Sequence, residues 1–210
     1  MSFTPQVEPS HYQNMVYDSK ERYISYWHQI DEVVRVRPSR CLEVGIGNGF
    51  VHRELRRHGL EVTTLDADSR LGPDVVGSVT ELPFEDEAFE AVCCFETLEH
   101  LPWDQLETAA SELGRVSSRH VLISLPDVTP YLNVDVRVGF GKRVVNLFRS
   151  MPDASPPRHE FNGEHYWEIG KQGYPLTRVL SSLSAAGLRT ENNFRVREYP
   201  YHHFFRLRVD

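Results

Sequence analysis

The sequence has little cysteine and no recognisable metal-binding pattern. Its 210 residues include three cysteines, an odd number, and no Cys/His spacing of the kind that zinc sites use. Cys41, Cys93 and Cys94 all fall in short apolar stretches that predict buried strands, where cysteine behaves as a small hydrophobic residue. We therefore expect neither a disulfide framework nor a bound metal, and this use of cysteine fits a reducing cytoplasm.

A membrane segment, a leader and an excess of positive charge are also missing. No apolar run approaches the length of a bilayer span. Residues 1–8 lack the basic start and apolar core of a signal peptide, which again predicts a cytoplasmic protein. The net charge of −7 gives no overall attraction to nucleic acid. The length of 210 residues fits a single domain with a substantial core.

Residues 41–50 carry the strongest local pattern that is present. A short apolar run ends in three glycines at alternate positions, Gly45, Gly47 and Gly49, and an amphipathic stretch follows over 51–58. The pattern predicts a strand, a tight turn and a helix. Glycine suits such a turn because it adopts positive φ and lets the backbone approach a ligand. The helix N-terminus then presents unpaired N–H groups, as in the cofactor turn of a doubly wound α/β fold.

The glycine spacing argues against a dinucleotide cofactor. The dinucleotide fingerprint G-x-G-x-x-G needs its third glycine for close packing of helix and strand. That position is Phe50 here, and Gly49 comes one residue early. The pattern Glu43-x-Gly45-x-Gly47-x-Gly49 instead resembles motif I of the class I S-adenosylmethionine-dependent methyltransferases, in which the acidic residue helps to anchor the methionine end. For this motif alone, a glycine turn without a ligand stays the alternative.

Two later stretches match the same family in the expected order. Residues 61–65 predict the second strand, and Asp66 ends it about 20 residues after Gly45, where a carboxylate meets a ribose diol in this kind of fold. Asp68 is a near competitor for that role. Residues 77–101 resemble the G-D-A-x-x-L-P-F…F-D-x-V…L-E-H-L stretch of the methyltransferase group often called type 11, which is the most specific signal in the chain.

The resemblance implies S-adenosylmethionine as the cofactor, together with the residues that bind it. Ser78 stands where relatives often have an aspartate that bonds the adenine amino group, so a weaker hydroxyl contact or the Val79 backbone is expected there. Phe95 and Glu96 end the fourth strand, which in relatives lies against the cofactor. The predicted cofactor-binding residues are Glu43, Gly45, Gly47, Asn48, Gly49, Asp66, Ala67, Ser78, Val79, Phe95 and Glu96.

Strands alternate with helices along the chain, which predicts an α/β fold with a mostly parallel sheet. The resemblance implies a doubly wound sheet of seven strands, the Rossmann-like methyltransferase fold, with residues 188–197 and 201–209 as a hairpin at one edge. Residues 1–37 predict an N-terminal arm followed by an amphipathic helix. The apolar stripe expected to pack that helix on the core is Tyr23, Ile24, Trp27, Ile30, Val33 and Val34.

Residues 127–174 form an insertion after the fifth strand that the common fold does not explain. They follow the carboxyl side of the sheet, where ligands bind. Within them, 141–150 predicts a short amphipathic helix, 151–158 a proline-rich loop, and 163–170 gathers titratable and aromatic side chains. We expect a lid that shapes the acceptor pocket. A purely structural insertion is the alternative, and a helix that touches a membrane surface is a weaker one.

The candidate proton acceptors are histidines and a glutamate near the expected pocket. The sulfonium of the cofactor already makes the methyl group electrophilic, so the protein must orient an acceptor, exclude water and, for a hydroxyl or ammonium, remove a proton. His100 follows the fourth strand and is the first candidate. His165 and Glu164 come second. His202 and His203 are adjacent in a strand and face opposite ways, which argues against a shared metal site.

The sequence therefore favours a methyltransferase that acts on a small-molecule acceptor, without identifying the acceptor or the oligomeric state. A methyltransferase-like protein that binds the cofactor without turnover is the first alternative, and the departure at Ser78 supports it mildly. An NAD(P)-dependent oxidoreductase is the second, opposed by Phe50. A nucleic-acid methyltransferase would rest only on arginines at alternating strand positions, which predict one solvated face. These arginines are Arg195, Arg197, Arg206 and Arg208.

Overall fold

The computed structural model describes residues 6–14, 16–140, 142–161 and 163–209. Its centre is a seven-stranded sheet in the order β3-β2-β1-β4-β5-β9-β8. The first five strands are parallel, and β9 runs antiparallel to both β5 and β8. The predicted doubly wound, mostly parallel sheet with an edge hairpin is confirmed. The strands are β1 (Arg40–Val44), β2 (Glu61–Asp66), β3 (Val75–Val76), β4 (Phe89–Phe95), β5 (Ser117–Pro126), β8 (Leu188–Arg195) and β9 (His202–Val209).

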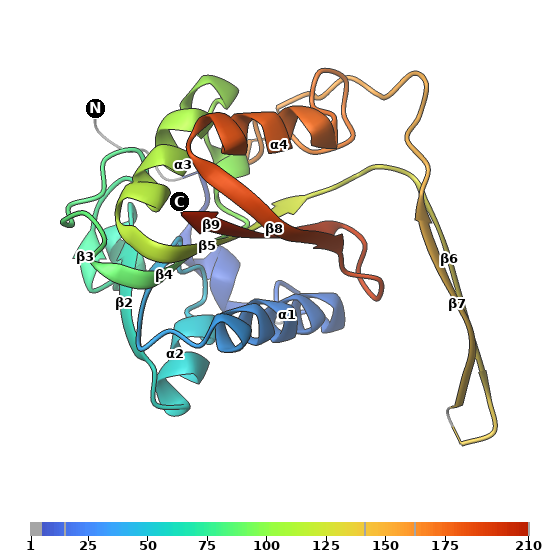
Figure 1. Cartoon of the computed structure of the whole chain (residues 1–210), viewed down its shortest axis with the longest axis horizontal. Coiled ribbons are helices and arrows are strands. Elements are labelled where there is room, and N and C mark those ends of the chain that lie inside the picture. The colour runs from blue at the N-terminus through green and yellow to red at the C-terminus, as the bar shows by residue number, and fades with distance from the viewer. Residues whose placement is uncertain (1–5, 15, 141, 162, 210) are drawn as a thin grey trace.

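Helices cover both faces of the sheet (Figure 1). Side chains alternate between two cores along each strand, so Cys93 packs with α1 and α2 while Cys94 packs with α3 and α4. Among the described residues, no helix is both long and apolar enough to cross a bilayer. The α-helices are α1 (Lys20–Val36), α2 (Phe50–Arg57), α3 (Leu106–Arg115) and α4 (Leu176–Ala185), and the 3₁₀ helices are η1 (Pro9–Gln13), η2 (Ser69–Leu71), η3 (Leu98–His100) and η4 (Trp103–Gln105).

Helix α1 buries a face that is rotated from the predicted one, so that Val33 of the expected stripe is buried and Ile24 and Ile30 pack against the core, but the other three residues are exposed. Tyr23, Trp27 and Val34 of the expected apolar stripe are 48%, 60% and 47% exposed. Glu32 of the buried face instead forms a two-pronged ion pair with Arg206 of β9, at 3.0 Å for each hydrogen bond. Polar partners on a distant strand therefore decide which face of this helix is turned toward the core. A pattern of hydrophobic residues in the sequence does not reveal such partners. The buried residues are Ser25, Tyr26, Gln29, Glu32, Val33 and Val36.

The insertion after β5 forms a β-hairpin where a helix was predicted. Strand β6 (Tyr131–Val138) pairs antiparallel with β7 (Lys142–Ser150), and the ribbon projects away from the body of the molecule (Figure 1). The predicted helix over 141–150 is wrong, apart from residue 141, which lies outside the described residues. The weaker alternative of a membrane-touching helix falls with it. Pairing with β6 decides the conformation of β7, because strand preference depends on cross-strand neighbours.

A buried polar network holds the base of this hairpin. The Asp127 carboxylate lies 2.9 Å from Nδ1 of His203 and 3.3 Å from Nε of Arg195. Arg195 also donates to the carbonyl oxygen of Thr129 at 2.8 Å and to Oγ of Ser150 at 3.3 Å. One guanidinium group therefore ties both ends of the hairpin to the sheet. Arg195 was predicted to lie on a solvated arginine face, and at 8% exposure it does not.

We expect Asp127→Ala to lower the free energy of unfolding by about 3–5 kcal/mol, because it leaves Arg195 buried without its counter-charge. Urea unfolding measures the change. Asp86→Ala is the matched control, because Asp86 pairs with Arg115 at the surface, with its side chain 75% exposed. That variant should stay within about 1 kcal/mol of the wild type. Equal losses in the two variants would show that the buried carboxylate contributes no more than a surface one.

Candidate functional site

A cavity of about 930 Å³ opens at the carboxyl ends of β1, β2 and β4. Its position is the point at which the chain order reverses between β1 and β4, where open α/β sheets bind ligands. The wall combines the glycine turn, the ends of β2 and β4, the N-terminal segment and residues 164–166 of the insertion. All of the predicted cofactor-binding and catalytic residues except Gly49 line this one cavity.

The three glycines of the turn have different surroundings, although all have positive φ of 80°, 51° and 71°. A Cβ at Gly45 would lie 2.2 Å from Oγ1 of Thr97, and one at Gly49 would meet the side chains of α2 at 2.6 Å. At Gly47 the nearest atom to such a Cβ is the hydroxyl of Tyr17, at 3.6 Å. Gly45 and Gly49 therefore allow close packing, whereas Gly47 faces the cavity.

Glu43 lies beneath the turn and is buried. Its Oε2 atom lies 2.9 Å from Nδ1 of His52 in α2. Burial raises the pKa of Glu43, and the hydrogen bond from His52 opposes that rise. The pair joins the end of β1 to the first turns of α2, so within this chain Glu43 braces the glycine turn.

Asp66 ends β2 and holds two backbone turns at once. Its Oδ2 accepts from the N–H of Ile46 at 2.9 Å, and its Oδ1 accepts from the N–H of Asp68 at 2.9 Å. Burial raises the pKa of Asp66. The competitor Asp68 is bound by the guanidinium of Arg70, with Nη2 2.8 Å from Oδ2. Since each carboxylate oxygen accepts more than one hydrogen bond, Asp66 retains acceptor capacity toward the cavity.

The loop after β3 carries the predicted adenine contacts. Oγ of Ser78 accepts from the N–H of Thr80 at 3.2 Å and lies 2.8 Å from the Thr80 hydroxyl. Val79 beside it is 7% exposed. The Ser78 hydroxyl is therefore engaged within its own loop, while Ala67 lines the cavity directly after Asp66.

The N-terminal segment covers the cavity, which the sequence analysis missed. Tyr12 and Tyr17 lie over Gly47, and their rings meet edge to face with centroids 5.2 Å apart. Oδ1 of Asp18 accepts from Nδ2 of Asn48 at 2.8 Å and so fastens the segment to the glycine turn. The tyrosines in an otherwise polar arm were the only sequence signal. Of the predicted arm, residues 1–5 and 15 lie outside the described part of the chain.

Glu96 follows β4 at the floor of the cavity in a strained conformation, with φ at 48°. A non-glycine residue in this region persists only where its surroundings impose it, often at functional sites. Oε2 of Glu96 lies 3.3 Å from Nε2 of His202, and burial raises the pKa of Glu96 to about 7. Among the described residues, its buried Oε1 has no hydrogen-bond partner.

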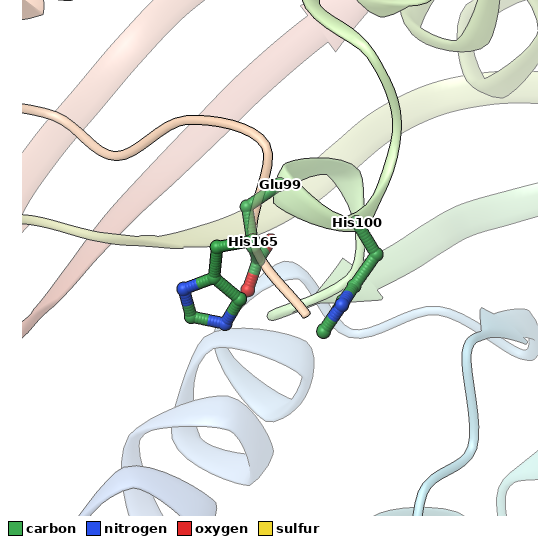
Figure 2. A group of neighbouring side chains, drawn as sticks. All are labelled: Glu99, His100 and His165. Carbon is green, nitrogen blue, oxygen red and sulfur yellow. The ribbon is translucent and has the colours of Figure 1, made fainter. Parts of the chain in front are cut away.

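Glu99, His100 and His165 come together at one end of the cavity (Figure 2). Figure 2 shows Glu99 and His100 on the short helix η3 and His165 on the neighbouring insertion. Nδ1 of His100 lies 2.8 Å from Oε1 of Gln6 and 3.0 Å from the backbone oxygen of Glu164. Burial lowers the pKa of His100 to about 4. The ring is therefore neutral at pH 7 and holds a proton weakly, which weakens its case as a general base.

Comparison with known proteins finds a family that is similar to the segment lining most of this cavity. Residues 42–124 match the family described as a methyltransferase domain. The matched segment is 83 of the 210 residues, less than half of the chain, and over it the chain is similar to this methyltransferase family. The match runs from β1 into β5 and includes the glycine turn, Asp66 and the Glu99–His100 pair. No sequence among the curated proteins matches this chain.

Solved structures share the fold of this chain over nearly its whole length. The PH0226 protein of Pyrococcus horikoshii is 17% identical, with 97% of this chain and 100% of that chain covered and a TM-score of 0.63. The 1,6-didemethyltoxoflavin-N1-methyltransferase of Burkholderia thailandensis, with 1,6-didemethyltoxoflavin and S-adenosylhomocysteine bound, is 16% identical over 99% and 93%, with a TM-score of 0.63. The magnesium protoporphyrin IX methyltransferase of Synechocystis, with S-adenosylhomocysteine bound, is 13% identical over 99% and 90%, with a TM-score of 0.60. The predicted Rossmann-like methyltransferase fold is confirmed.

Proposed function

We propose that this protein is a methyltransferase that transfers the methyl group of S-adenosylmethionine to a small-molecule acceptor. The observation that carries the proposal is one continuous cavity with the glycine turn and Asp66 on one side and a cluster of titratable groups on the other. Such a cavity has room for a cofactor and an acceptor side by side. The family match over 42–124 supports it, as do the two neighbours with S-adenosylhomocysteine bound.

In this proposal the cofactor lies along the carboxyl edge of the sheet. Asp66 accepts hydrogen bonds from the ribose hydroxyls, and the turn around Gly47 receives the methionine end. The adenine lies near Val79, whose backbone takes over the contact that Ser78 does not make. Tyr12 and Tyr17 close the cavity above the turn and exclude water, which strengthens electrostatic interactions inside.

The reaction is a substitution at the methyl carbon. A lone pair of the acceptor attacks that carbon, the carbon–sulfur bond breaks, and its electron pair stays on sulfur to give S-adenosylhomocysteine. A hydroxyl or ammonium acceptor also releases a proton. His100, Glu164 and His165 stay the candidates for contact with the acceptor, with the neutral His100 ring suited to accepting a hydrogen bond. Residues 164–166 close this end, so we assign the lid role to them and not to the projecting hairpin.

The position of Phe50 argues against a reaction that uses a dinucleotide cofactor. Its ring stacks on Tyr26 of α1, with centroids 4.8 Å apart, and fills the position where a dinucleotide fingerprint has its third glycine. Binding of S-adenosylmethionine without turnover is the remaining alternative. The engagement of Ser78 within its own loop is the observation that favours it.

Two further parts of the proposal rest on the surroundings of particular side chains. We do not expect nucleic acid as a substrate, because Arg195 is buried and Arg206 is paired with Glu32. A reducing, cytoplasmic location stays a prediction. Its support is that Cys41 and Cys93 are free thiols, although their sulfurs lie only 3.4 Å apart.

Calorimetric titration with S-adenosylhomocysteine tests the cofactor assignment, and NAD is the control ligand. We expect one site with micromolar affinity for S-adenosylhomocysteine and no heat from NAD. Failure to bind S-adenosylhomocysteine, or binding of NAD in its place, would contradict the proposed function. If binding succeeds, the protein is incubated with S-adenosylmethionine that carries a labelled methyl group and with a panel of small hydroxyl, amine and carboxyl acceptors. Formation of a labelled product separates turnover from binding alone.

A further inference from the structure

We propose that Glu99, His100 and His165 form a binding site for a divalent transition-metal ion, with Zn²⁺ as the reference case. Each side chain offers one ligand atom, and these three atoms all lie within 4.8 Å of one another. Two imidazoles and one carboxylate are a common donor set of catalytic metal sites, in which a further position stays open to water or substrate. Here that position would face the cavity that all three residues line.

The strongest evidence is the carboxylate of Glu99. The residue is 0% exposed, and among the described residues neither of its oxygens has a hydrogen-bond partner. Buried polar atoms nearly always have a partner, and an unpaired buried carboxylate is especially unfavourable. Protonation would leave a buried hydroxyl in the same position. A cation between Glu99 and the two histidines would supply the missing partner.

Both histidine rings are anchored in the way that metal ligands usually are. A ligand histidine commonly donates its other ring N–H to a carbonyl or carboxylate, which fixes the tautomer and the ring orientation. Nδ1 of His100 lies within hydrogen-bonding distance of the Gln6 and Glu164 oxygens, and Nδ1 of His165 lies 3.0 Å from Oε1 of Glu168. The hydroxyl of Tyr201 in turn donates to Glu168 at 2.8 Å. These contacts present Nε2 of each ring as the ligand atom.

The backbone already holds the two contributing segments together. The N–H of Tyr166, next to His165, donates to the backbone oxygen of Glu99 at 2.8 Å. The rings of His100 and His165 meet nearly at right angles, with centroids 5.1 Å apart. Zinc–ligand bonds of about 2.1 Å put tetrahedral ligand atoms about 3.4 Å apart. Small side-chain rotations would therefore close the site, and the bound ion would fasten the insertion to η3.

The site also indicates the class of acceptor, an inference that rests on the proposed methyl transfer. A hydroxyl oxygen of the acceptor would take the open position, and the ion would lower the pKa of that hydroxyl. Its proton then leaves to solvent, the oxygen bonds to the methyl carbon, and sulfur keeps the electron pair of the broken bond. Such an acceptor needs no strong base.

Calorimetric titration of chelator-treated full-length protein with Zn²⁺ tests the site, and Co²⁺ with its visible absorption bands reports the ligand geometry. We expect one equivalent to bind, and Glu99→Gln and His165→Ala each to weaken binding about 100-fold or more, since even an orienting partner is worth up to that factor. His58→Ala is the control, because His58 directly follows α2, is half-exposed and lies beside Glu54. Circular dichroism confirms folding, and His165→Ala in the insertion serves if Glu99→Gln does not fold.

Absence of binding to the wild type, or equal affinity in His165→Ala and His58→Ala, would overturn the metal site. Titration of the same samples with S-adenosylhomocysteine separates this result from the proposed function. If S-adenosylhomocysteine binds and Zn²⁺ does not, the metal site fails and the methyltransferase proposal stands. If Zn²⁺ binds in the expected way and S-adenosylhomocysteine does not, the metal site stands and the cofactor assignment fails.

Discussion

Gly45→Ala is expected to abolish binding of S-adenosylhomocysteine and to lower the free energy of unfolding by about 2–5 kcal/mol. Two effects add. Gly45 has φ at 80°, a conformation that alanine adopts with strain, and the new Cβ would lie 2.2 Å from Oγ1 of Thr97. The turn would have to move away from β4, and the N–H of Ile46 would leave Asp66. Urea unfolding and calorimetric titration measure the two losses.

Gly59→Ala is the control that separates strain from collision. Gly59 has φ at 84°, almost the same as Gly45, but no atom lies within 4 Å of a Cβ built there. This variant should show only the backbone strain of about 1–2 kcal/mol and bind S-adenosylhomocysteine normally. Thr97→Ala introduced together with Gly45→Ala should recover part of the stability, because it removes the nearest colliding atoms. Equal destabilisation by the two glycine variants would refute the collision with Thr97.

Asp66→Ala is expected to weaken S-adenosylhomocysteine binding more than about tenfold. The change removes the proposed ribose ligand and the acceptor that holds the N–H of Ile46, and loss of hydrogen bonds to a charged group is worth about 1.5–3 kcal/mol. Asp66→Asn keeps one oxygen acceptor and should fall between Asp66→Ala and the wild type. Calorimetric titration of each variant gives the affinities.

Asp68→Ala is the matched control for Asp66, because both carboxylates line the cavity and they are only two positions apart in the sequence. Asp68 is bound by Arg70, so its loss should change S-adenosylhomocysteine affinity less than about threefold. If Asp68→Ala weakened binding as much as Asp66→Ala, the ribose ligand would be misplaced by two residues.

The sequence by itself determined the parallel sheet and the residues around the cofactor cavity. The reason is that their requirements are local. Positive φ at Gly45 and Gly47 favours glycine whatever surrounds it, and the end of a parallel strand brings Asp66 to the same edge of the sheet as the turn. The contiguous stretch over 77–101 contributes a further part of the cavity wall. These patterns can be interpreted without knowing which segments contact one another in the folded chain.

The tertiary structure alone decided the features that depend on partners distant in sequence. The rotation of α1 follows from the ion pair of Glu32 with Arg206, and β7 is a strand because β6 lies beside it. Residues 6–14 and 16–18 cover the cavity through contacts that the sequence of a polar arm does not predict. The cluster of Glu99 with His165 joins η3 to an insertion more than sixty residues away, so no spacing rule predicts it. Short motifs predict local backbone conformation, because its requirements lie within a few residues. Burial and side-chain contacts depend on which distant segments meet, so only the folded chain determines them.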